Sequence, residues 1–114
     1  MYKRQQSGDY KSAIGALQDF VRRYPQSAYA ANAQYWLGNA YYAQRDCKNA
    51  ILAQQQLIKT YPDSPKAPDA MLNIASCQAE LKAVNNAKKT LNELMKTYPN
   101  SAAAKTAKER LGGK

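Results

Sequence analysis

With 114 residues, 45% apolar and 22% charged, the chain has the composition of one folded domain rather than of a disordered polymer. It contains no run of about 18 apolar residues, so we expect no membrane insertion. Histidine is absent, and Cys47 and Cys77 lack a paired Cys-x-x-Cys spacing, which argues against a metal or cofactor site. An enzyme is a competing class, but no nucleophile–base pair or Gly-rich phosphate loop supports it. We therefore expect no catalytic residues and no cofactor.

The net charge of +9 leaves two interpretations, a solvated basic surface and a nucleic-acid module. Eight Lys and Arg residues fall within residues 1–60 and nine within residues 61–114, so the positive charge is spread along the chain. This even distribution favours the solvated surface. We expect no nucleic-acid partner.

A repeated four-residue phrase, Tyr-Pro-x-Ser, organises the chain. It begins at Tyr24, Tyr61 and Tyr98, and both steps are 37 residues (61 − 24 and 98 − 61). A fixed period in this range indicates one supersecondary unit stacked on copies of itself. We therefore expect a single repeat domain over residues 1–114, whose function depends on a binding surface.

In chain order, we expect a partial first repeat over about residues 1–25, full repeats over about 27–62 and about 64–99, and a capping helix over about 101–111. In the middle repeat, apolar and small residues at helical spacing predict one helix from Ser27 to about Gln44 and a second from about Cys47 to Thr60. The turn between them is short and polar, so the two helices must run antiparallel.

The repeated phrase is expected to separate one unit from the next. Its proline ends the preceding helix because the ring and the missing N–H interrupt the hydrogen-bond ladder. Its serine is expected to cap the next helix through a side-chain oxygen, and Pro65 suits a first helical position. We expect the tyrosine ring to pack against the helix that it closes.

Matched columns at the 37-residue step predict which positions form the core, with small residues where helices approach closely and bulky ones between them. The small columns are Ala13/Ala50/Ala87, Ala30/Ala67/Ala104 and Ala33/Ala70/Ala107, and the bulky ones are Phe20/Leu57/Leu94, Val21/Ile58/Met95 and Leu37/Ile74/Leu111.

These columns resemble the tetratricopeptide repeat (TPR). The middle repeat carries its Leu-Gly, Tyr, Ala and Pro signature as Leu37, Gly38, Tyr41, Ala50 and Pro62. The resemblance implies an all-α solenoid of antiparallel helix pairs with a C-terminal capping helix.

The longer repeat, with phrases such as Tyr-Pro-Asp-Ser-Pro-Lys-Ala-Pro-Asp-Ala, is similar to the C-terminal domain of the Tol-Pal system family YbgF/CpoB over about residues 9 to 111. That resemblance implies a non-enzymatic interaction domain in the periplasm of Gram-negative bacteria. It implies TolA as partner, a role in coordinating outer-membrane constriction with peptidoglycan synthesis machinery at cell division, and trimers formed by a coiled coil outside this chain.

An alternative is a TPR scaffold of an outer-membrane assembly lipoprotein of BamD type, because BamD repeats share a similar Tyr-Pro-x-Ser corner. BamD normally has more repeats and a lipidated cysteine near its mature start. An export signal followed by heptads in the full-length gene product would favour YbgF/CpoB, whereas a lipidated cysteine would favour BamD.

If the usual TPR register applies, one stripe of each first helix faces the concave side of the stack. We call this set the concave stripe: Asn32, Tyr35, Asn39 and Tyr42 in the middle repeat, and Asp69, Leu72, Ser76 and Ala79 in the next. Tyrosine and asparagine on a preformed wall suit peptide recognition. Tyrosines at helical spacing also seal repeat packing, which we expect for Tyr41 and leave open for Tyr35 and Tyr42.

Trp36 and the two cysteines each have two interpretations. Trp36 lies between the core stripe and the concave stripe, as a core-edge residue or as an interface anchor. Cys47 and Cys77 fall on helices expected to be antiparallel neighbours, so a disulfide is an alternative to two buried free thiols. The columns of both cysteines hold other core residues, which favours the free thiols.

Overall fold

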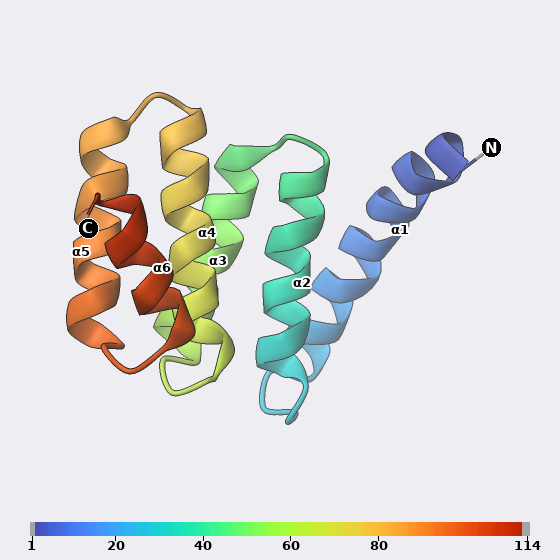
Figure 1. The fold of residues 1–114 in the computed structure, drawn as a ribbon. Helices are drawn as coiled ribbons and strands as arrows, with labels where there is room; N and C mark the ends of the chain where they lie inside the picture. The colour runs from blue at the N-terminus through green and yellow to red at the C-terminus, as the bar shows by residue number, and fades with distance from the viewer. Residues whose placement is uncertain (1, 113–114) are drawn as a thin grey trace.

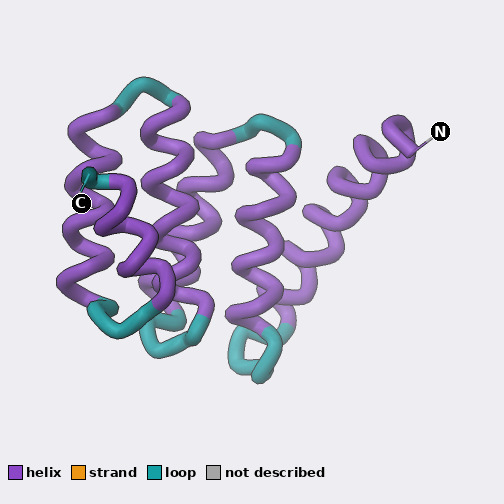
Figure 2. Tube along the Cα trace, viewed as in Figure 1, coloured by secondary structure: helices purple, strands orange, loops and turns teal. Residues whose placement is uncertain are grey.

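The computed structural model describes residues 2–112, with side chains described from Tyr10 onward. In this range the chain forms six α-helices and no strand, as Figures 1 and 2 show. They are α1 (Tyr2–Arg23), α2 (Ala30–Ala43), α3 (Cys47–Thr60), α4 (Lys66–Glu80), α5 (Val84–Thr97) and α6 (Ala102–Arg110). The predicted fold class, an all-α solenoid of the TPR type, is confirmed.

The helices stack in chain order, and the contacts between them separate an inner layer from an outer one. Each helix contacts the next, and α4 also contacts both α2 and α6. Among the described helices, α1, α3 and α5 make no contact with one another. The first helices α2, α4 and α6 therefore form the closely packed side of the stack, and the second helices are spread apart on the other side (Figure 1).

The core consists of most of the small and bulky columns that the sequence predicts, whereas the Val21/Ile58/Met95 column is only half-buried. Leu57 and Leu94, which are equivalent at the 37-residue step, have no exposed surface. The alanines of two small columns are also buried, which lets the helices approach closely. These columns are Ala30/Ala67/Ala104 and Ala33/Ala70/Ala107. In the first repeat the corresponding bulky residue, Phe20, is only half-buried.

The tyrosines of the Tyr-Pro-x-Ser corners link one corner to the next. The Tyr61 hydroxyl donates a hydrogen bond to the Pro25 carbonyl oxygen (2.6 Å), and the Tyr98 hydroxyl donates to the Pro62 carbonyl oxygen (2.8 Å). Tyr98 also packs against the core residues of its own repeat, as expected. The corner tyrosine thus fixes the register between successive repeats.

The predicted serine caps are confirmed at one corner and wrong at two. Ser101 caps α6, since its Oγ accepts from the Ala104 N–H at 3.0 Å. Ser27 and Ser64 instead accept from the N–H two residues later, at 3.1 Å each. A tight turn therefore follows each serine, and α2 and α4 begin later than predicted, with Pro65 at the N-cap rather than the first helical position.

The turns within the two complete repeats share one backbone form. Arg45 (φ 62°) and Lys82 (φ 68°) both adopt the left-handed conformation directly after the C-caps of α2 and α4. The Asp46 and Ala83 N–H groups then donate back to carbonyl oxygens in the last turns of these helices, at 2.9 and 2.8 Å. This is the Schellman ending of a helix, made here without glycine.

Candidate protein-interaction site

The predicted concave stripe lies on helices α2 and α4, which contact each other directly. Asn32, Tyr42 and Ala79 are exposed. The remaining members are half-buried: Tyr35, Asn39, Asp69, Leu72 and Ser76. Every member is therefore at least partly accessible to another polypeptide.

Two members of the stripe are already engaged by the next first helix. The Asn73 Nδ2 group of α4 donates to the Asn39 Oδ1 at 2.7 Å. One repeat later, an Arg110 guanidinium nitrogen of α6 donates to the Ser76 Oγ at 2.6 Å. Because both bonds join equivalent positions, they are repeated ties between units, and Asn39 and Ser76 contribute to the structure.

Tyr35 of the stripe forms an aromatic and lysine cluster with Trp36 and Lys66. The rings of Tyr35 and Trp36 meet edge to face, with centroids 5.4 Å apart and an interplanar angle of 66°. The Lys66 Nζ, at the start of α4, lies 5.0 Å from the Tyr35 ring centroid and 5.8 Å from that of Trp36. A cation over aromatic faces fixes the rings in place and offers both charge and contact area.

Trp36 is 54% exposed and belongs to none of the described core clusters. Its equivalents at the 37-residue step, Asn73 and Arg110, reach back to the preceding first helix. This exposure of Trp36 fits both interpretations, a core-edge residue and an interface anchor.

Tyr42 is held by the neighbouring repeat. Its hydroxyl donates a hydrogen bond to the Glu80 carboxylate near the end of α4. This bond to Glu80, together with burial and the negative charge of that carboxylate, raises the pKa of Tyr42 to about 12. The ring is thus oriented before any partner binds, while 41% of the residue stays exposed.

Lys66 and Glu80 were not predicted as site residues. Lys66 occupies the column of Tyr29, which is also highly exposed in the structure, and the repeat alignment carries no signal for its contact with the two rings. Glu80 lies on α4 beyond the stripe, and its contact with Tyr42 depends on how far the two helices are offset.

The two cysteines are buried free thiols in one cluster with Ala50. Burial, together with the neighbouring Cys47 thiol, raises the pKa of Cys77 well above its ordinary value. The thiol form of Cys77 is therefore favoured, and the structure agrees with the free-thiol interpretation.

None of the helices in the described part is both long and apolar enough to cross a membrane. In the same part of the chain, no group of three His, Cys, Asp or Glu residues gathers as metal ligands would.

The stacked antiparallel helix pairs define a TPR-type helical repeat domain. The chain belongs to the YfiO family, described as outer membrane lipoprotein, whose family model matches residues 1–112. It is also similar to two relatives named "Cell division coordinator CpoB", from Pseudomonas putida strain KT2440 and from Pseudomonas putida. Each is 50% identical over 38 residues, which cover 33% of this chain and 14% of the relative's length. The predicted resemblance to CpoB is confirmed.

Proposed function

We propose that this chain is a non-enzymatic protein-interaction domain of a Tol-Pal associated protein in the bacterial periplasm. Its partner is TolA, and its role is to help coordinate outer-membrane constriction with the peptidoglycan synthesis machinery at cell division. The observation that carries the proposal is the 50% identity, over 38 residues, to proteins named as cell division coordinators. Trimers of the full-length protein, formed through a region outside this chain, belong to the same proposal.

The concave stripe, together with Trp36 beside it, supplies the chemistry that such a partner would need. Tyr35, Trp36 and Tyr42 offer aromatic area, and rigid rings lose little conformational entropy on binding. Asn32 offers an exposed amide able to satisfy the backbone of a guest segment. Because Lys66 and Glu80 hold the rings before binding, the surface is preorganised.

The test is a calorimetric titration of a purified soluble TolA domain into the wild-type chain and its variants. Trp36→Ala and Tyr42→Ala are expected to weaken binding by about tenfold or more, as for central aromatic residues of interfaces. Leu52→Ala is the control, because Leu52 is an exposed apolar residue on α3, away from the stripe.

Thermal unfolding of each variant, followed by circular dichroism, separates binding from folding. Trp36→Ala and Tyr42→Ala should melt close to the wild-type temperature, since both residues are substantially exposed. Loss of TolA binding only in parallel with loss of helicity would mean that these residues are structural. Equal weakening by Leu52→Ala would contradict the assigned surface.

A second candidate function is a TPR scaffold of an outer-membrane assembly lipoprotein of BamD type. The observation that favours it is the family match over residues 1–112, since that family is described as outer membrane lipoprotein. Affinity purification of the full-length protein from envelope extracts distinguishes the two. Enrichment of TolA supports the first candidate, and enrichment of outer-membrane assembly components without TolA supports the second.

A further inference from the structure

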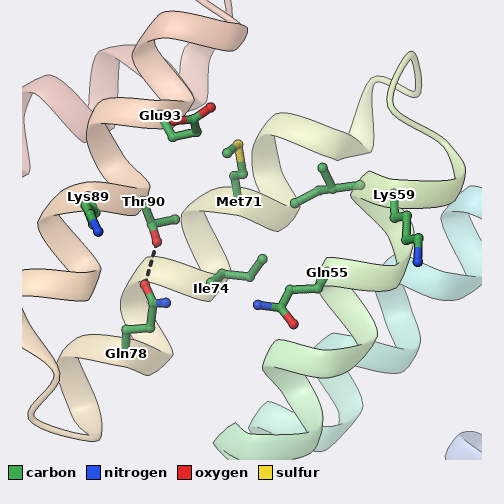
Figure 3. A pocket seen from close by; sticks show the side chains of 9 residues that line it. Gln55, Lys59, Met71, Ile74, Gln78, Lys89, Thr90 and Glu93 are labelled. Atoms are coloured by element: carbon green, nitrogen blue, oxygen red, sulfur yellow. Dashed lines mark hydrogen bonds between the residues drawn. The ribbon is translucent and has the colours of Figure 1, made fainter.

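A hollow of about 430 Å³ lies on the outer side of the stack, away from the concave stripe. It is bounded by helices α3 and α5, with α4 beneath them, and we call it the α3–α5 groove. Figure 3 shows Met71 and Ile74 of α4 between a wall that carries Gln55 and Lys59 and a wall that carries Lys89 and Thr90. The hollow exists because α3 and α5 both pack on α4 without contacting each other.

The α3–α5 groove and the concave stripe use opposite faces of α4. On α4, each groove residue comes two positions after a residue of the stripe: Met71 after Asp69, Ile74 after Leu72, and Gln78 after Ser76. Two residues of an α-helix correspond to a rotation of about 200°. The domain can therefore hold one polypeptide in the stripe and another in the groove.

One repeat earlier, the equivalent groove between α1 and α3 is smaller, with a volume of about 250 Å³. There Gln34 is buried, and its Nε2 donates to the Ala53 carbonyl oxygen at 2.7 Å. The Gln18 Nε2 donates to the Tyr41 hydroxyl at 2.7 Å. In this α1–α3 groove, Gln34 is thus bonded to a backbone carbonyl, and Gln18 is bonded to the Tyr41 hydroxyl.

The α3–α5 groove replaces one of these polar groups, the buried Gln34, with an apolar one, whereas Gln55 keeps an amide at the position of Gln18. Met71 stands at the position of Gln34, and with Ile58 and Ile74 it forms an apolar floor. Gln78 stands at the position of Tyr41 and accepts a hydrogen bond from the Thr90 hydroxyl at 2.6 Å, which keeps its amide against the wall. Met71 and Ile58 remain half-buried, so an apolar side chain placed there would gain contact area.

The rim of the α3–α5 groove selects the charge of an occupant. Lys59 and Lys89 stand on opposite walls, and Glu93 is the single acidic residue of the lining. Within the described range, ion pairs form only at Asp19, with Arg22 and Arg23, so neither rim lysine is neutralised. The equivalent α1–α3 groove is lined by no charged residue.

We propose that the α3–α5 groove is a second docking surface, which takes an acidic amphipathic segment of a partner protein. A large apolar side chain of that segment enters the floor of Ile58, Met71 and Ile74. Flanking carboxylates of the segment pair with Lys59 and Lys89, and this pairing weakens as salt rises. The two surfaces together make the domain an adaptor that connects two polypeptides.

The test uses a designed fluorescent peptide with one phenylalanine flanked by glutamates at helical spacing, titrated into the wild-type chain with a methyl-labelled methionine. Saturable binding at concentrations up to about millimolar is expected, with the Met71 methyl resonance shifting along the titration. Two reference peptides, one with serine in place of phenylalanine and one with lysines in place of glutamates, should not bind.

Matched variants separate this groove from a general effect of charge. Lys59→Glu combined with Lys89→Glu should weaken binding by about tenfold or more. Lys48→Glu combined with Lys88→Glu alters the net charge equally at exposed sites outside the groove and should change little. Met71→Gln, which copies Gln34, should also weaken binding, whereas Trp36→Ala should not.

Absence of saturable binding, equal losses in the two charge pairs, or equal binding of the lysine peptide would overturn the proposal. An increase in the sedimentation coefficient that Met71→Gln abolishes would show that a second copy of the chain fills the groove, and it would also overturn the proposal. Circular dichroism of each variant confirms that helicity is kept, and a Met71→Gln chain that failed to fold would leave the lysine pairs as the deciding variants.

Discussion

Helices α2 and α3 cross where Gly38 faces Gln54, whereas at the equivalent crossing of α4 and α5 both Ala75 and Leu91 belong to one buried cluster. A Cβ atom added at Gly38 would lie 2.3 Å from the Gln54 Nε2. The Gln54 side chain therefore fits here only because residue 38 has no methyl group. The two repeats therefore fill the same space with different residues. The residue on the first helix is smaller where the side chain that faces it reaches further: glycine faces glutamine in one repeat, and alanine faces leucine in the next.

The largest expected effect comes from the two leucines that fill equivalent places in the two repeats. Leu57→Ala and Leu94→Ala each remove a side chain with no exposed surface, so each should cost about 2–5 kcal/mol in the free energy of unfolding. Urea unfolding measures both. A cost below about 1 kcal/mol at either site would contradict the assignment of that leucine to a well-packed core cluster.

Gly38→Ala should lower the free energy of unfolding by about 1–3 kcal/mol through overpacking against Gln54. In a Gln54→Leu background, which copies Leu91, the same substitution should cost little, because alanine favours the helix over glycine by about 1 kcal/mol. A double-mutant cycle on urea unfolding measures the coupling. Additive effects would show that the Gln54 side chain is not what excludes a methyl group at position 38.

Alkaline pH should destabilise the domain through Cys77. An unfolded thiol ionises near about pH 8.5, whereas the folded pKa of Cys77 is raised by burial and by Cys47. Both states are protonated below that pH, so stability is intact there and is lost as pH rises, by up to about 1.4 kcal/mol per pH unit.

Urea unfolding between about pH 8 and pH 9 measures this loss, where tyrosines ordinarily remain mostly protonated. Cys77→Ala is the matched control, because alanine already occupies the equivalent position as Ala40. A variant that kept the full alkaline slope would assign the effect to other groups.

The smallest expected effect concerns the corner hydrogen bonds. Tyr61→Phe and Tyr98→Phe each remove one hydroxyl that donates to a proline carbonyl, so each should cost about 0.5–1.5 kcal/mol. Tyr24→Phe is the control, since Tyr24 is largely exposed and makes no such bond within the described residues. Equal costs at all three sites would show that the hydroxyl bonds do not hold the register.

The repeat fold could be predicted from the sequence because small and bulky residues recur in matched columns at a fixed 37-residue period. Sequence reasoning misplaced the starts of α2 and α4, since a serine side chain satisfies a turn or a helix end equally well. It gave no indication of the left-handed turns at Arg45 and Lys82, because glycine or asparagine is the usual residue there.

The candidate surfaces were less predictable than the core. Contacts such as Lys66 over the Tyr35 ring and Tyr42 with Glu80 depend on the offset between helices, which periodicity does not specify. The α3–α5 groove follows from spreading of the second helices, which only the three-dimensional arrangement reveals.

Trp36 is the only tryptophan of the chain, and its ring contacts Tyr35 of the concave stripe, so its fluorescence reports on binding at that stripe. Titration with a purified soluble TolA domain should shift its emission to shorter wavelength and protect it from iodide quenching, both saturating with binding. Saturable TolA binding that leaves the Trp36 emission and its quenching unchanged would contradict the proposed use of this face.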